Sequence, residues 1–176
     1  TNDSLHIGYN DLYYAIEKIS NGKHVKDFNI SEITPIMTMG SMNNMQHSTP
    51  IGNIEKIDGV PVYHSWISFL MSTNTGSNNT WNLSFNYQIR DSVGTIGNKP
   101  LYVKALSSGL SNLKSFKYNG NTYFLSLVNP NNFVTGVNTI KAYISKKSSV
   151  ITTPYALASE QFIVAITPTM PDMGNH

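Results

Sequence analysis

The 176-residue chain contains no cysteine and few charged residues. The lack of thiols excludes disulfides, thiolate metal sites and a cysteine nucleophile. Charged residues make up 12% of the chain, well below the usual share of about 25%. Their balance is 12 Lys and Arg against 10 Asp and Glu, a formal net charge of +2, and the longest basic run is Lys146-Lys147. This is too little positive charge to drive binding to a phosphate backbone, so nucleic acid is excluded as a partner.

Long apolar runs and catalytic motifs are missing as well. No uninterrupted apolar run approaches the roughly 20 residues of a membrane-spanning helix, so we expect no membrane-spanning segment in this chain. The sequence also has no nucleophile elbow, no recognisable pair of catalytic carboxylates, and no Gly-rich phosphate loop between a strand and a helix. We therefore expect a protein that is not an enzyme.

Uncharged polar residues provide the surface polarity that the few charged residues do not. The chain contains 21 Asn, 20 Ser and 15 Thr, residue types that favour turns and strand faces over helix interiors. Ten Tyr and seven Phe provide enough bulk for a hydrophobic core. This composition favours a folded, strand-rich protein.

The apolar residues recur with a period of two almost everywhere. The clearest case is residues 81–89, where apolar and polar side chains alternate without exception, as in a strand with one buried and one wet face. Residues 62–71 predict the preceding strand, and 74–79 have the composition of a hairpin turn. Further strands are predicted at 5–9, 12–18, 25–33, 101–106, 123–128, 137–145 and 162–167. Helical periodicity is limited to about one turn at 155–161.

Short strands separated by Gly, Asn and Pro turns predict an all-β fold. We expect two immunoglobulin-like antiparallel β-sandwich units in tandem, 1–92 and 97–176, each near the size of an immunoglobulin-like domain. The boundary between them is expected at 91–98, after the strongest strand and before a fresh series of strands. One larger sandwich is the alternative.

The methionines are clustered. Four of the seven lie within residues 37–45, where uniform scatter would place fewer than one. A second group lies near the end of the chain. Each group follows the tripeptide Ile-Thr-Pro and leads into a histidine, within residues 33–47 and 166–176. The two segments therefore form an internal repeat.

Thioethers are soft, neutral ligands that suit Cu(I), and imidazole binds Cu(I) as well. A Met/His loop, residues 35–50, is expected to bind one soft metal ion, most plausibly Cu(I). The first-choice ligands are Met42, Met45 and His47, completed by Met37 or Met39. The corresponding motif at 168–176 supplies Met170, Met173 and His176. Hard ions such as Mg²⁺ are not expected, because the loop has no Asp or Glu between Ile33 and Pro50.

Two other interpretations of the loop stay open. The methionines fill irregular gaps well, so the loop can cap the open end of a sandwich as packing material. Alternatively, it forms an exposed soft patch that binds an apolar partner. A separate candidate is a sugar-stacking platform made of Tyr13, Tyr14, Trp66 and Trp81, although Trp81 belongs to the apolar face of its strand.

The segment from Pro168 to His176 resembles the hallmark of YtkA-like (FixH-like) domains, in which a Met-Pro-x-Met-Gly-His motif follows a strand. Tyr63, the run 69–71 and the triplet 81–83 resemble the closing hairpin of the same family. The resemblance covers most of residues 1–90 and, more weakly, 97–176. It implies small exported β-sandwiches with a suspected role in copper handling.

The two units depart from the family pattern. The first motif is expanded and lacks the Met-Pro pair. The second stops at His176, so either its sandwich uses the longer upstream segment or the unit is incomplete. Composition and resemblance together predict an exported protein of the cell envelope, periplasmic or a surface lipoprotein, with a metal ion and a protein of the envelope as partners. The alternative function is a structural or adhesive module of the cell surface that binds a protein or a glycan.

Overall fold

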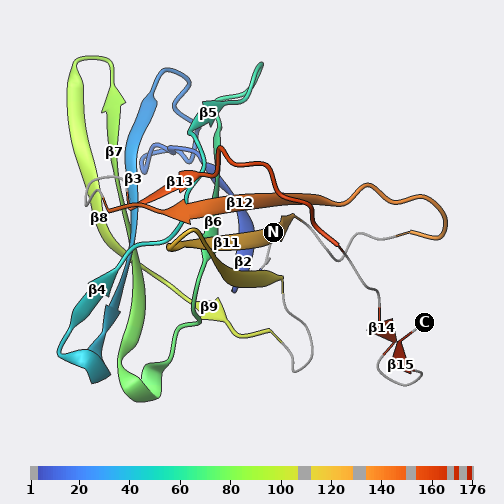
Figure 1. The fold of residues 1–176 in the computed structure, drawn as a ribbon. Coiled ribbons are helices and arrows are strands. Elements are labelled where there is room, and N and C mark those ends of the chain that lie inside the picture. The colour runs from blue at the N-terminus through green and yellow to red at the C-terminus, as the bar shows by residue number, and fades with distance from the viewer. Residues whose placement is uncertain are drawn as a thin grey trace.

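The computed structural model describes residues 4–106, 112–128, 134–149, 154–165, 169–170 and 174–175. It is an all-β protein, 56% strand and 3% helix, which confirms the expected fold class and the near absence of helix. Its larger sheets are all antiparallel (Figure 1). Among the described residues no helix is both long and apolar enough to cross a membrane.

The first sheet has the strand order β4-β3-β7-β8. Its strands are β3 (Asn29–Met39), β4 (Met45–His47), β7 (Asn79–Ile89) and β8 (Ser92–Leu101). The alternating segment 81–89 forms most of β7, as its pattern predicts. Its Trp81 and Leu83 side chains are buried, and Phe85 and Ile89 pack, partly buried, against the same core.

The second sheet has the order β2-β6-β5 and faces the first across the core. Its strands are β2 (Gly8–Tyr14), β5 (Glu55–Lys56) and β6 (Tyr63–Phe69). Tyr14 of β2 and Ile67 and Phe69 of β6 join Trp81 of the first sheet in one hydrophobic cluster. The Phe69 and Trp81 rings meet edge to face at 5.1 Å, and the Trp81 indole donates to the Met71 carbonyl at 2.9 Å. The two sheets thus form a sandwich with a continuous core.

The third sheet covers the outer face of the second. It has the order β10-β11-β12-β13, with β10 (Leu113–Tyr118), β11 (Asn121–Val128), β12 (Lys141–Lys147) and β13 (Tyr155–Leu157). Its strands run across those of the first two sheets (Figure 1). Tyr143 of β12 stacks on Tyr9 at 5.7 Å and on Trp66 at 4.6 Å between ring centroids. The Ser68 and Ser126 hydroxyls are hydrogen bonded beside them.

Short elements complete the fold. A parallel pair joins β1 (Leu5–His6) to β9 (Val103–Lys104), and η2 (Thr75–Ser77) lies between β6 and β7. Near the C-terminus, β14 (Thr169–Met170) pairs with β15 (Gly174–Asn175). The β1–β9 pair brings residues about one hundred positions apart in sequence side by side.

Several local expectations were wrong, among them the strand at 162–167, which is not formed in its described part, 162–165. Most of 91–98, where a boundary but no strand was expected, belongs to β8, which pairs with β7 along nearly its whole length. The strand expected at 25–33 does not end before Pro35 but continues, as β3, to Met39. The expected helical turn at 155–161 instead begins with β13. The division into immunoglobulin-like units 1–92 and 97–176 stays a prediction.

Candidate functional site

The Met/His segment forms a β-hairpin rather than an irregular loop. Strand β3 leads into the 3₁₀ turn η1 (Gly40–Met42), and β4 returns beside β3. Asn43 and Asn44 have left-handed backbones, with φ of 54° and 58°, which asparagine tolerates better than most residues. The Gly40 amide donates to the Asn78 carbonyl at 3.2 Å, which ties the turn to the loop before β7. The sequence therefore fixes the turn.

The register of the hairpin brings four of the predicted ligands together. Met39 is directly opposite Met45, and Met37 is directly opposite His47. Residues directly opposite in an antiparallel pair share a face, with Cβ atoms about 4.5–5.5 Å apart. Residues two apart on one strand share that face too. Met37, Met39, Met45 and His47 are consequently neighbours on one face of the hairpin, which Met37 continues into the core.

The four methionines of the hairpin have different environments. Met37 is fully buried, at 0% exposure, in the cluster that contains Trp81. Met39 is partly buried against the same core. Met42 and Met45 expose 48% and 47% of their surface. Of the two methionines expected to complete the site, Met37 therefore packs in the core and Met39 is the more accessible, while Met42 and Met45 are half-exposed.

His47 is half-buried, and its ring has no hydrogen-bond or ion-pair partner among the residues that the structure describes. Such an imidazole keeps a nitrogen lone pair free for a metal or for water. Within the described part of the chain, no group of three His, Cys, Asp or Glu side chains could hold a metal ion. The donors of the hairpin are thus thioethers and one imidazole, a set that suits soft ions and not hard ones.

The structure describes only part of the second motif. Met170 lies in β14, with its backbone paired to Gly174. Met173 and His176 lie outside the described residues. A related site in this motif stays a prediction.

The aromatic residues do not form an open platform. Trp81 and Tyr14 are buried in the core, and Trp66 is buried beneath Tyr143. Tyr13 alone of the four predicted platform residues is exposed, at 65%. The sugar-stacking prediction is wrong, because strand alternation and the third sheet cover the other rings.

A polar cluster on the outer face of β2 and β6 was not predicted. The His64 imidazole Nε2 lies 2.7 Å from the Asp11 carboxylate, and the Tyr9 hydroxyl donates to the same carboxylate at 2.5 Å. Burial, and then the bond to Asp11, raises the pKa of the Tyr9 phenol well above its ordinary value. His64 also lies against the Tyr13 ring, at 5.1 Å. Only the pairing of β2 with β6 brings these side chains together, since His64 and Asp11 are 53 residues apart.

Comparison with protein-family models, with curated proteins and with solved structures found no match to this chain.

Proposed function

We propose that the β3–β4 hairpin binds one soft metal ion, of the Cu(I) class, through Met39, Met45 and His47, with Met42 as a fourth donor. The observation that carries the proposal is the strand register, in which Met39 faces Met45 and His47 lies on the same face. Met42 is in the turn next to them, and its unbranched thioether side chain is flexible.

The donor set favours exchange over permanent storage. Thioethers and imidazole are neutral, so a filled Cu(I) site keeps its positive charge. No carboxylate lies between Glu32 and Glu55 in the sequence to offset that charge. The half-exposed side chains of Met42 and Met45 would also leave the ion open to a second protein. A carrier that receives and passes on its ion fits this arrangement better than an enzyme does.

The setting of the proposed site is the cell envelope. Thiol-free sequence, a weakly charged surface rich in Asn, Ser and Thr, and the resemblance to YtkA-like domains all support an exported protein. Thioethers resist the oxidation that disables thiols, which suits Cu(I) binding in such a compartment.

The test is a Cu(I) titration against a competing chelator under reducing conditions. The triple variant Met42→Leu, Met45→Leu, His47→Ala should lose Cu(I) retention. Met37→Leu removes a thioether from the same hairpin but from inside the core, so it should retain Cu(I) like the parent. Circular dichroism checks that each variant keeps its strand content. A triple variant that retains Cu(I) as well as the parent does would end the proposal.

A further inference from the structure

The methionines of the chain differ in how easily a dissolved reagent reaches them. The structure describes the burial of Met37, Met39, Met42, Met45 and Met71. Met37 is fully buried, and Met39 and Met71 pack, partly buried, against the core. Met42 and Met45 are the two exposed ones among these five, and neither belongs to the hydrophobic cluster. Their hairpin lies at one end of the sandwich (Figure 1).

The fold itself keeps these two side chains exposed. Met42 ends the turn η1, which contains no buried residue, and Asn43 with its left-handed backbone follows at once. Met45 begins β4, the outermost described strand of the first sheet. A tight turn and a sheet edge both leave a side chain open to solvent, so the exposure follows from the hairpin and not from a loose terminus.

An exposed thioether reacts with peroxides, although it cannot form a disulfide. The sulfur lone pair attacks one oxygen of hydrogen peroxide, a sulfur–oxygen bond forms, and the oxygen–oxygen bond breaks. The departing hydroxide takes up the remaining proton and leaves as water. The sulfur is oxidised by two electrons and the peroxide is reduced by two. The product, methionine sulfoxide, is polar and is no longer a thioether donor for a soft ion.

We propose that peroxides oxidise Met42 and Met45 selectively and that this modification reversibly weakens Cu(I) binding by the hairpin. The inference rests on the proposed function, because these residues are two of its four donors. The added oxygen atoms lie outside the core, so the fold tolerates them. Met37 packs in the cluster that contains Trp81, where a polar sulfoxide would be buried without water. Enzymes that reduce methionine sulfoxide would restore the site.

The first test measures the order of oxidation. The metal-free protein is treated with dilute hydrogen peroxide, catalase stops the reaction, and mass spectrometry of peptides and their fragments locates each added oxygen. Met42 and Met45 should be oxidised about tenfold or more faster than Met37, which reacts only when the protein opens. Met37 is the internal control, because it belongs to the same hairpin. Equal rates for the three residues would overturn the selectivity.

The second test compares Cu(I) binding before and after this treatment, with a competing chelator under reducing conditions. Oxidation should weaken binding about tenfold or more, since losing even an outer-shell partner of a metal ligand costs about that much. Methionine sulfoxide reductases specific for each of the two sulfoxide epimers should together restore it. Circular dichroism should show unchanged strand content throughout.

Two variants separate the modification from general damage. Met37→Leu should lose Cu(I) affinity on treatment as the parent does. The double variant Met42→Leu, Met45→Leu should have the same, already weakened, affinity before and after treatment. A parent that binds Cu(I) equally well after both methionines are oxidised would overturn this inference alone. A parent that binds no Cu(I) before treatment would end the proposed function as well.

Discussion

Gly40 is the residue on which the position of the Met/His hairpin depends. A Cβ atom built at this position would lie 2.6 Å from the Asn78 Cβ and 3.0 Å from the Asn78 carbonyl oxygen. A carbonyl oxygen is part of the main chain and a Cβ is fixed to it, so a change of rotamer moves neither atom aside. The backbone of η1 can approach the loop before β7 only because residue 40 has no side chain.

We expect Gly40→Ala to destabilise the protein by about 1–3 kcal/mol, the usual cost of inserting a methyl group where there is no room. Gly97→Ala is the matched control, because a Cβ there meets nothing within 4 Å and its φ is not positive. Its free energy of unfolding should stay within about 0.5 kcal/mol of the parent. Urea denaturation measures both. Equal effects of the two substitutions would contradict the close approach.

Glu160 is held by two donors from the third sheet. Its Oε1 accepts from the Lys146 ammonium at 2.8 Å and from the Tyr123 hydroxyl at 2.8 Å. The Lys146 bond, followed by the Tyr123 bond, lowers the pKa of the Glu160 carboxyl from 4.5 to about 2. The ionised form of this carboxyl group is therefore more stable in the folded protein than in the unfolded chain.

A depressed pKa sets the pH range in which this contact stabilises the fold. Its contribution is complete above pH 4.5 and is lost as the pH falls towards about 2. Glu160→Gln should therefore be less stable than the parent at pH 6, and the difference should shrink between pH 4.5 and 2. Chemical denaturation at several pH values measures it. A difference that grows as the pH falls would have the wrong sign.

At the scale of elements, strands in which apolar and polar residues alternate were predicted correctly. The prediction failed where a single residue, Pro35, was taken to end a strand. Strand β7 was predicted because apolar and polar residues alternate along it, and Trp81, Leu83, Phe85 and Ile89 pack in or against the core as that pattern requires. The end of β3 was missed because Pro35 indicates a stop. Beside Pro35, β3 pairs with β7 on one side, but its pairing with β4 begins only at Met37, so the absent amide hydrogen costs the sheet little.

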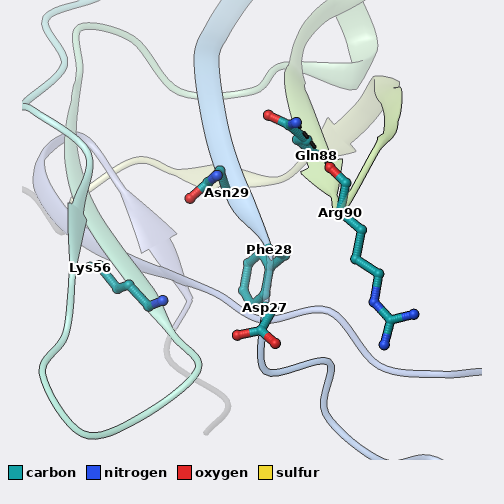
Figure 2. Close-up of a pocket in the computed structure, with 6 residues that line it drawn as sticks. All are labelled: Asp27, Phe28, Asn29, Lys56, Gln88 and Arg90. Atoms are coloured by element: carbon teal, nitrogen blue, oxygen red, sulfur yellow. Dashed lines mark hydrogen bonds between the residues drawn. The ribbon is translucent and has the colours of Figure 1, made fainter.

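The candidate site was predictable only in part, for a related reason. Residue types and spacing identified the methionines and His47, but which methionine is core depends on the register of β3 with β7. That register puts Met37 opposite Trp81, inside the sandwich. An open pocket beside Asn29 and Gln88 could not be predicted at all, because only the pairing of β3 with β7 brings these two residues, 59 positions apart, together (Figure 2).

The turn of the hairpin gives a test at this scale. Val in place of both Asn43 and Asn44 should destabilise the protein by about 2–4 kcal/mol, since each left-handed residue with a branched side chain costs about 1–2 kcal/mol. Hydrogen exchange of the amides in β4 should accelerate, and Cu(I) retention should weaken. The control replaces both with Gly, which accepts a positive φ and should keep β4 protected. Equal exchange in the two variants would count against the left-handed turn.

At the scale of the molecule, one aromatic stack joins the third sheet to the sandwich. Tyr143 lies nearly parallel to Tyr9 and Trp66, with interplanar angles of 11° and 19°. Trp66 also lies so close to Gly52 that a Cβ there would come within 2.1 Å of the indole nitrogen. The stack is thus confined from both sides, and it links β12 to β2 and β6.

Whether the chain unfolds as one unit or two depends on this stack. We expect Tyr143→Ala to lower the free energy of unfolding by about 1–3 kcal/mol, because it removes a half-buried ring and two ring contacts. If the stack is the main coupling between the sheets, urea denaturation of the variant should separate into two transitions. Tyr102→Ala removes a ring that is 62% exposed and makes no ring contact within the described residues, so it should change little. A Tyr143→Ala variant with one unshifted transition would mean that Ser68, Ser126 and the neighbouring backbone suffice to hold the third sheet in place.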